Sequence, residues 1–283
     1  MNRWAYYNEI DPFAVLWIKE MIKFGLIADG EVDQRSIEDI RADDVAGFRE
    51  CHFFAGIGIW ALVLRQAGWP DGRPVWTGSC PCQPFSVAGK RVGFADKRHL
   101  WPCWYRLISE CRPGTIIGEQ VAGKAGMQWW DVVADDLENA GYAVAAANLC
   151  ACSVGAPHIR QRLYWLADSR EYGLQGAVVN RQVRCSSADC GLSNPYSEQR
   201  QWSEAEFAGH RVQKFANHSQ THWSRIAYVQ CGDGKIRPIK PGIECLVDGF
   251  AGRGALLRCL GNTIVAPLAK TFVETVMEVT HGL

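Results

Sequence analysis

The sequence lacks every segment that would carry a chain into or through a membrane. The residues from Met1 to Glu9 hold no apolar stretch of signal-peptide length. No run approaches the roughly 18 apolar residues that a membrane span needs. The chain also lacks net charge, because 30 basic side chains balance 30 acidic ones, so overall charge does not indicate a nucleic-acid partner. We therefore expect a cytoplasmic protein that does not associate with membranes.

Paired CxxC motifs are also missing, although the chain contains 12 cysteines. Without a secretion signal, these cysteines are expected to be reduced thiols. Cys80-x-Cys82 and Cys150-x-Cys152 are spaced too closely for a zinc knuckle. We expect no bound metal, and the weaker alternative is a loosely spaced zinc site formed by Cys185, Cys190, Cys231 and Cys245.

Strand-like and helix-like segments alternate from residue 1 to residue 167. Apolar runs of strand length recur along this part of the chain, with helical periodicity between them. The alternation predicts an α/β fold with a doubly wound, mostly parallel sheet. Strands are expected at 4–9, 51–54, 75–77, 115–117, 142–149 and 163–167, and helices at 12–24, 59–67 and 127–140.

The pattern changes between Asp168 and Cys245. Ser, Asn, Gln, Arg and Gly dominate there and the periodicity weakens, which predicts an inserted, loop-rich region. A glycine turn and a helix follow between Leu256 and Met277. We expect a first domain over residues 1–167, the insert over 168–245, and a C-terminal segment over 246–283 that returns to the first domain.

The segment from Gly78 to Ser86 carries the most informative pattern. Cys82 lies between Pro81 and Pro84, after an apolar run. The prolines restrict the backbone and remove two N–H donors, so the loop is stiff and can present a thiol in a fixed direction. A presented thiol indicates a nucleophile, whereas most cysteines are small buried hydrophobes. This segment does not decide between the two by itself.

Four more motifs occur with Pro81–Ser86. They are the glycine turn Phe54-Ala55-Gly56-Ile57-Gly58, then Gly118-Glu119-Gln120-Val121, His158-Ile159-Arg160-Gln161-Arg162 and Gly261-Asn262-Thr263. In this order the five motifs closely resemble those of the cytosine-C5 DNA methyltransferases. The resemblance covers most of the chain outside Asp168–Cys245. It implies a Rossmann-like methyltransferase fold, and it makes the insert a target-recognition region.

The resemblance also implies a role for each motif. Cys82 would add to C6 of a flipped-out cytosine and so activate C5. Glu119 would hold N3 in its protonated form, and Arg162 would contact O2. Arg160 would help to place the target strand. The methyl donor would be S-adenosyl-L-methionine and the acceptor double-stranded DNA. The implied cofactor-binding residues are Phe54, Ala55, Gly56, Gly58, Glu9, Ile10, Asp33, Pro81, Leu100 and Asn262.

Plainer explanations exist for some of these residues. Glu119 could be a surface acid after a strand. The two arginines could belong to a solvated edge strand. Asn262 could be a helix N-cap, which is compatible with a place on the cofactor side.

The motif order departs from the family pattern in one place. Family members usually carry the ribose-binding acid between the glycine-turn helix and the Pro-Cys segment, where this chain has only Gly68–Pro74. Asn8–Ala14 resembles the missing unit, and Val32–Ile37 resembles the next one. We therefore expect a permuted order, in which the second and third strand units precede the first. Glu9 would bind the ribose hydroxyls, and Asp33, or alternatively Asp39, would meet the adenine.

Three single residues also depart from the family. His52 stands where many relatives have an acid, Gln120 replaces the usual asparagine, and His158 replaces the usual glutamine. No catalytic group is lost, so we expect an active, monomeric enzyme of a bacterial host or a phage, with a possible restriction-linked role. The alternatives are an RNA cytosine methyltransferase and a non-catalytic DNA-binding decoy. A thiol redox protein ranks last, because Cys80 and Cys82 lack CxxC spacing.

Overall fold

The computed structural model describes residues 3–70, 73–81, 100–156, 158–169 and 261–280, together with the backbone of four strands between residues 203 and 239. The chain divides into two compact units. The first comprises Met1–Leu149, Gln161–Gln182 and Gly254–Leu283, and the second comprises Cys150–Arg160 and Val183–Arg253.

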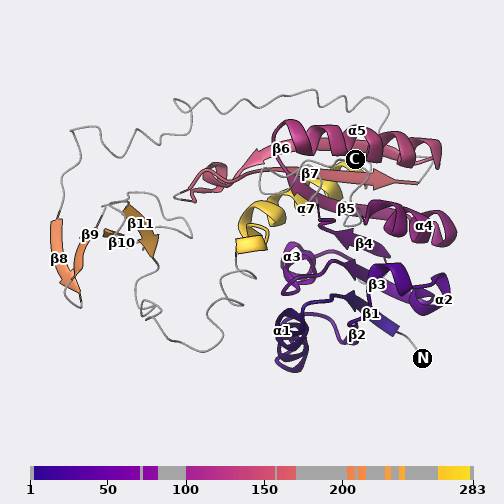
Figure 1. The fold of residues 1–283 in the computed structure, drawn as a ribbon, viewed down its shortest axis with the longest axis horizontal. Coiled ribbons are helices and arrows are strands. Elements are labelled where there is room, and N and C mark those ends of the chain that lie inside the picture. Colours follow the sequence, from indigo (N-terminus) through magenta and orange to yellow (C-terminus); the bar gives the residue numbers. More distant parts are fainter. Residues whose placement is uncertain are drawn as a thin grey trace. The chain divides into compact units, whose positions relative to one another are not determined.

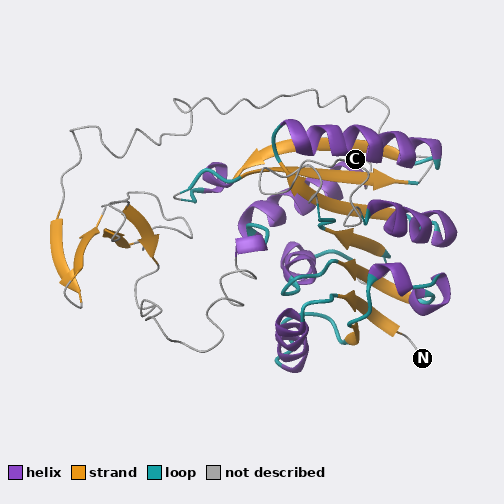
Figure 2. Cartoon of the chain, viewed as in Figure 1, coloured by secondary structure: helices purple, strands orange, loops and turns teal. Residues whose placement is uncertain are grey.

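A seven-stranded sheet forms the centre of the first unit (Figures 1 and 2). Its strands are β1 (Arg3–Asn8), β2 (Gly30–Asp33), β3 (Phe48–Phe53), β4 (Val75–Gly78), β5 (Thr115–Val121), β6 (Ala143–Cys150) and β7 (Gln161–Asp168). The order across the sheet is β2-β1-β3-β4-β5-β7-β6. Neighbours from β2 to β5 pair in parallel, and β7 pairs antiparallel with β5. The predicted α/β fold with a mostly parallel sheet is confirmed.

The strand order shows where the first two strands belong. Doubly wound sheets that bind nucleotides commonly have the order 3-2-1-4-5. This sheet has the same order when β3, which precedes the glycine turn, is counted as its first strand, β1 as its second and β2 as its third. The two strands that come first in the sequence therefore take the second and third places in space, as the permuted motif order predicts.

Helices cover both faces of this sheet (Figure 1). They are α1 (Pro12–Lys23), α2 (Ala42–Val45), α3 (Ile59–Ala67), α4 (Trp101–Cys111), α5 (Lys124–Asn139) and α7 (Ala266–Thr280), with the 3-10 turn η1 at Ile37–Asp39. Side chains of η1, α2, α4 and α5 share one apolar core. Those of α1 and α3 share another, and α7 packs against α3. Two separate cores on opposite faces are what a doubly wound sheet requires.

Helix α1 begins and ends where the sequence predicts. The Oδ1 atom of Asp11 accepts hydrogen bonds from the backbone N–H groups of Phe13 and Ala14, at 2.9 and 3.2 Å. Pro12 occupies the first turn, where its missing N–H costs nothing. Gly25, with φ of 64°, follows the last turn and donates its N–H to the Ile22 carbonyl. The cap fixes the short link between β1 and α1, which contains Glu9.

Tryptophan side chains form a rigid layer under α4 and α5. Trp104 is fully buried, and its ring centroid lies 5.7 Å from that of Trp101 and 5.8 Å from that of Trp165. Two glycines make room for this layer. A Cβ added at Gly78 would lie 2.5 Å from the Trp104 ring, and one added at Gly118 would lie 2.2 Å from the Trp165 ring. The ends of β4 and the middle of β5 are thereby held against the core.

The second unit contains a four-stranded antiparallel sheet. Its strands are β8 (Ser203–Phe207), β9 (His210–Lys214), β10 (Ala227–Gln230) and β11 (Ile236–Ile239), in the order β11-β10-β9-β8. This part of the chain was expected to be loop-rich. Its strands are only four or five residues long, which is too short for a clear alternation of apolar and polar residues to mark them in the sequence. Within the residues that the structure describes, no helix has the length and apolar character of a membrane span.

Candidate active site

Glu9 follows β1, and its carboxylate accepts a hydrogen bond from the glycine turn after β3. Its Oε2 atom accepts a hydrogen bond from the Gly56 N–H at 2.7 Å, and its Oε1 atom accepts one from the Asp11 N–H at 2.9 Å. The pairing of Asn8 with Phe53 across β1 and β3 brings these groups together. Burial raises the pKa of Glu9 above its ordinary value of 4.5, although the backbone hydrogen bonds act in the opposite direction. Two predicted cofactor motifs thus meet at one carboxylate.

The glycine turn has a backbone that favours small residues. Gly56 and Gly58 have φ of 55° and 81°, and Phe54 has φ of 51°, which is uncommon for a residue with a side chain. Ala55 donates its N–H to the Asn8 carbonyl at 3.0 Å, which ties the turn to β1. A Cβ at Gly56 would meet no described atom within 4 Å. A glycine turn with a carboxylate beside it is the arrangement with which nucleotide-binding sheets hold a ribose.

Ile10 and Leu100 differ in exposure. Ile10, directly after Glu9, is 64% exposed, so an apolar side chain lies free beside the carboxylate. Leu100 is partly buried, packs against the core and precedes α4. Pro81 ends the described segment after β4. Of these three, Ile10 lies beside the group formed by Glu9 and the glycine turn.

Asp33 ends β2, and its carboxylate is already engaged. Tyr6 donates its hydroxyl to Oδ2 at 2.7 Å, and Arg35 donates Nη2, Nε and its backbone N–H. Burial opposes ionisation, but the bonds from Arg35 and Tyr6 outweigh it and hold the pKa of Asp33 below its usual range. A carboxylate has about four acceptor positions, so these donors fill them. Contact between Asp33 and adenine remains a prediction, and it would require Arg35 to move.

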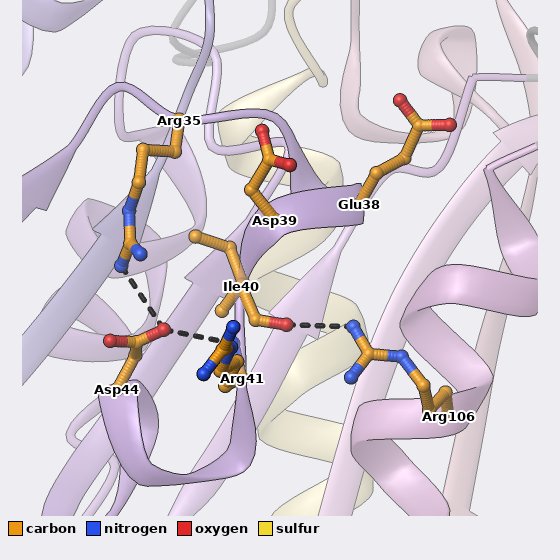
Figure 3. Close-up of a pocket in the computed structure, with 7 residues that line it drawn as sticks. All are labelled: Arg35, Glu38, Asp39, Ile40, Arg41, Asp44 and Arg106. Carbon is orange, nitrogen blue, oxygen red and sulfur yellow. Dashed lines mark hydrogen bonds and ion pairs between the residues drawn. The ribbon is translucent and has the colours of Figure 1, made fainter.

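The alternative acid, Asp39, lines an open cavity of about 460 Å³ on the face of the sheet that η1, α2 and α4 cover (Figure 3). Two of the arginines in its wall have partners within the wall. Arg35 Nη2 lies 3.1 Å from Asp44 Oδ2, and Arg106 Nη2 donates to the Ile40 carbonyl at 2.7 Å. Asp39 is exposed, whereas the Asp33 side chain is only 8% exposed. The lining residues are Arg35, Glu38, Asp39, Ile40, Arg41, Asp44 and Arg106.

Glu119 and Arg162 form an ion pair across β5 and β7. Arg162 Nε lies 2.9 Å from Glu119 Oε1, and the side chains are 22% and 9% exposed for arginine and glutamate respectively. In the antiparallel register Glu119 lies opposite Tyr164 and Arg162 lies opposite Val121, so the two charged residues are diagonal neighbours on adjacent strands. Glu119 was expected at a strand end but lies within β5. The last paired residue of β4 faces Gly118, so Glu119 is the first residue of β5 beyond β4.

Gln120 has a contact that the sequence does not reveal. Its Nε2 donates to the Cys80 carbonyl at 3.0 Å, and its Oε1 accepts the Val121 N–H at 2.8 Å. Cys80 itself is buried in the main core, as a packing residue should be. Trp60 Nε1 also donates to Ser79 Oγ at 3.2 Å. The only signal in the sequence was the replacement of the family's asparagine by a longer amide.

Several predicted residues fall outside this group. Cys82, with the rest of residues 82–99, lies outside the described residues, as do the four loosely spaced cysteines considered for zinc. Among the residues that are described, no group of three or more His, Cys, Asp or Glu side chains could hold a metal ion. The position of the predicted nucleophile is therefore not described. The described residue that precedes it is Pro81.

Arg160 lies in a different unit from Glu119, and Asn262 does not open the final helix. Arg160 and His158 belong to the second unit. Burial and the charge of Arg160 lower the pKa of His158. Asn262 was expected to open the final helix, but α7 begins at Ala266 and Val265 accepts its first hydrogen bond, from Ala269 N. Asn262 is exposed, and it does not cap α7.

The sequence matches a family model for the C-5 cytosine-specific DNA methylases over residues 74–234. This range is more than half of the chain. The chain belongs to the C-5 cytosine-specific DNA methylase family. In this methylase family member, β1, β2 and the glycine turn precede the matched range, so the sheet order and the Glu9 contact define that part of the site.

Curated relatives of this family member include bacterial Type II methyltransferases. Type II methyltransferase M.NgoMIV of Neisseria gonorrhoeae is 32% identical over 112 residues, which are 38% of this chain and 36% of that protein. Type II methyltransferase M.HgiBI of Herpetosiphon aurantiacus is 30% identical over 170 residues, which are 46% of this chain and 39% of that protein. The chain thus covers less than half the length of these relatives.

A solved structure shows a more distant similarity. The Entamoeba histolytica methyltransferase EhMeth is 17% identical, with a TM-score of 0.42, over 58% of this chain and 44% of that one. The fold of the methylase domain is assigned from its own strand order rather than from this similarity.

Proposed function

We propose that this protein transfers a methyl group from S-adenosylmethionine to C5 of a cytosine in double-stranded DNA. The observation that carries the proposal is the ion pair between Glu119 and Arg162 at 2.9 Å, beside the end of β4. Strand β4 leads directly into Pro81 and Cys82. A carboxylate, a guanidinium and the approach to a thiol therefore meet at one edge of the sheet, in a member of a cytosine-C5 methylase family.

Glu9 and the glycine turn would hold the donor. The carboxylate of Glu9 holds backbone N–H groups beside the glycine turn, and it would accept hydrogen bonds from the ribose hydroxyls at the acceptor positions that remain. The exposed side chain of Ile10 offers an apolar surface to the adenine. When bound, the donor supplies an electrophilic methyl group on a sulfonium centre. Which of Asp33 and Asp39 meets the adenine amino group is decided by whether Arg35 releases Asp33.

Cys82 supplies the nucleophile. Its thiolate adds to C6, which forms an S–C6 bond and moves ring electrons toward C5. C5 then takes the methyl group as the sulfonium–carbon bond breaks. Loss of the C5 proton to solvent restores the ring and expels the thiolate, so Cys82 is regenerated.

Glu119 and Arg162 would bind the polar edge of the base. In the ion pair, Glu119 is a carboxylate. An entering cytosine offers O2 to Arg162 and N3 to Glu119. As Arg162 turns toward O2, Glu119 would take a proton from solvent and donate it to N3. The guanidinium of Arg162 beside O2 and the proton on N3 would stabilise the electron-rich ring after thiolate addition. Arg160 would place the target strand.

The target base has to leave the duplex to reach such a site. The expected target-recognition region over 168–245 would recognise the target sequence. We propose a monomeric enzyme acting in the cytoplasm of a bacterial cell or of a phage-infected host. Its relatives' names as Type II methyltransferases are consistent with a restriction-linked role.

Covalent trapping tests this function. With S-adenosylmethionine and duplex DNA containing 5-fluorocytosine, the wild-type protein should form a stable adduct, because the fluorine on C5 cannot leave as a proton does. Cys82→Ala should lose both the adduct and methyl transfer while retaining DNA binding. Cys80→Ala is the matched control, since Cys80 is a buried core residue, and it should retain both. Undiminished transfer by Cys82→Ala would contradict the proposal.

The same assay separates the alternatives. Methylation of transfer RNA in place of duplex DNA would identify an RNA methyltransferase. DNA binding by the wild-type protein with neither adduct nor transfer would identify a non-catalytic binding protein.

A further inference from the structure

The side chain of Gln120 continues the hydrogen bonding between β4 and β5 beyond the point where the strands stop pairing. The parallel ladder ends with Gly78 opposite Gly118. Cys80 lies two residues beyond Gly78, after the end of β4, and Gln120 lies two residues beyond Gly118, within β5. There, the amide of Gln120 bridges the gap, with Nε2 donating to the Cys80 carbonyl at 3.0 Å and Oε1 accepting the Val121 N–H at 2.8 Å. One side-chain amide thus links the backbones of both segments.

We propose that Gln120 is a positioning residue, which fixes the chain that leads into Cys82 and so directs the thiol toward the base. The inference rests on the proposed role of Cys82 as the nucleophile. Gln120 would act through the Cys80 carbonyl, and it would not touch the substrate. Nothing in the family resemblance gives this role to the longer amide, which stands where relatives usually carry asparagine.

The covalent geometry explains why one hydrogen bond has this effect. The Cys80 carbonyl belongs to the planar peptide unit that ends at the Pro81 Cα. The proline ring then fixes φ of Pro81 near −65°. With the carbonyl held by Gln120, only ψ of Pro81 turns freely before the peptide unit that carries the Cys82 nitrogen. Without that bond, the whole Cys80–Pro81 unit gains freedom.

A second contact holds the same segment from the cofactor side. Trp60, in the first turn of α3, donates Nε1–H to Ser79 Oγ at 3.2 Å. Gln120 of β5 therefore bonds to Cys80, and Trp60 of α3 bonds to the adjacent residue Ser79. The approach to Cys82 is tied both to Glu119, the neighbour of Gln120, and to the proposed donor site.

The chemistry of this position is demanding, because Gln120 and Cys80 are each only 3% exposed. Methionine at position 120 would match glutamine in length but would leave the Cys80 carbonyl and the Val121 N–H without this partner. Glutamate would place an acceptor against the Cys80 carbonyl. Asparagine keeps the amide on a shorter arm, so it should restore the bridge in part.

The test compares Gln120→Met, Gln120→Asn and Gln120→Glu with the wild-type protein. Methyl transfer to unmethylated duplex DNA is measured under single-turnover conditions, and KM for S-adenosylmethionine at steady state. Misplacement of a reacting group by about 1 Å costs about 100-fold in rate. We expect that loss in kcat for Gln120→Met, a smaller loss for Gln120→Asn, and KM within about two-fold of wild type. Gln128→Met, the same change at an exposed site on α5, should change neither.

A second measurement does not depend on activity. Amide hydrogen exchange of the peptide containing Val121, and of the peptide containing Cys82, should be at least ten-fold faster in Gln120→Met than in wild type or Gln128→Met. Gln120→Asn and Gln120→Glu give the same comparison if Gln120→Met fails to fold. Unchanged exchange and unchanged kcat would overturn the positioning role. If exchange is faster in Gln120→Met but the wild-type protein transfers no methyl group, the proposed function is overturned and the structural role of Gln120 stands.

Discussion

Gly56 donates its backbone N–H to Glu9 Oε2 at 2.7 Å, although the two residues are 47 positions apart in the sequence. This hydrogen bond joins the strand unit that begins the chain to the glycine turn that follows β3. It also leaves a partly buried carboxylate with a raised pKa at the proposed donor site. Donor binding should therefore depend on the ionisation of Glu9.

The first prediction concerns the pH dependence of donor binding. Only the ionised carboxylate can accept hydrogen bonds from the ribose while it accepts those of Gly56 and Asp11. Because the pKa of Glu9 is raised above 4.5, the affinity for S-adenosylmethionine should fall on acidification at a higher pH than for an ordinary glutamate. Calorimetric titrations between pH 4.5 and 8, within the range where the protein stays folded, would measure this loss.

The control is Glu9→Gln, which cannot ionise. It should bind the donor about ten-fold or more weakly at pH 7.5, as expected when a buried hydrogen-bonding group is lost, and its affinity should vary less with pH. Folding stability should respond to Glu9 in the opposite direction. A carboxyl with a raised folded pKa destabilises the fold when ionised, and protonation relieves that cost as the pH falls. Donor affinity of Glu9→Gln equal to that of wild type would show that Glu9 does not bind the ribose.

The sequence predicted most of the sheet because its strands are marked by local features. The apolar runs, the Asp11-Pro12 cap and the positive-φ glycines each need only neighbouring residues. The place of β1 beside β3 was predicted only because the motif order was compared with a family pattern. The short strands of the second unit were missed, since strands of four or five residues are too short to show a clear period of two.

The side-chain contacts of the site were harder to predict. The sequence indicated Glu119 and Arg162 separately, but their contact depends on the antiparallel register of β5 and β7, which no local pattern encodes. The bond from Tyr6 to Asp33 and the bridge made by Gln120 also depend on pairing between distant segments. Sequence reasoning therefore proposed reacting groups but missed the residues that contact them.

The second prediction concerns the pair formed by Glu119 and Arg162. Glu119→Gln and Arg162→Met should each lower single-turnover methyl transfer by about 100-fold, the usual cost of removing one group that stabilises developing charge. The double variant should be little slower than the worse single variant, because the two side chains act on the same base and contact each other. The three rates and the wild-type rate complete a double-mutant cycle.

An exposed ion pair provides the control for this cycle. Arg106 and Glu110 lie 3.9 Å apart on α4, with side chains 41% and 45% exposed. Glu110→Gln removes a carboxylate of similar charge away from β5, and it should leave the transfer rate unchanged. Multiplicative losses in the double variant would mean that Glu119 and Arg162 act independently.

The third prediction tests how tightly β5 is packed next to Glu119. A Cβ at Gly118 would lie 2.2 Å from two atoms of the buried Trp165 ring, so Gly118→Ala has to shift either the ring or the strand. Overpacking of this kind costs about 1–3 kcal/mol. The midpoint of urea unfolding should fall accordingly, and methyl transfer should fall further, since a shifted β5 also moves Glu119.

Gly114→Ala is the matched control. Gly114 precedes β5, a Cβ there meets no described atom within 4 Å, and its φ is not in the left-handed range, so its midpoint should be unchanged or slightly higher. Combining Gly118→Ala with Trp165→Phe, which offers a smaller ring, should recover part of the lost stability. Equal midpoints for Gly118→Ala and Gly114→Ala would show that the tryptophan layer gives way without cost, and that Glu119 is not held in place from below.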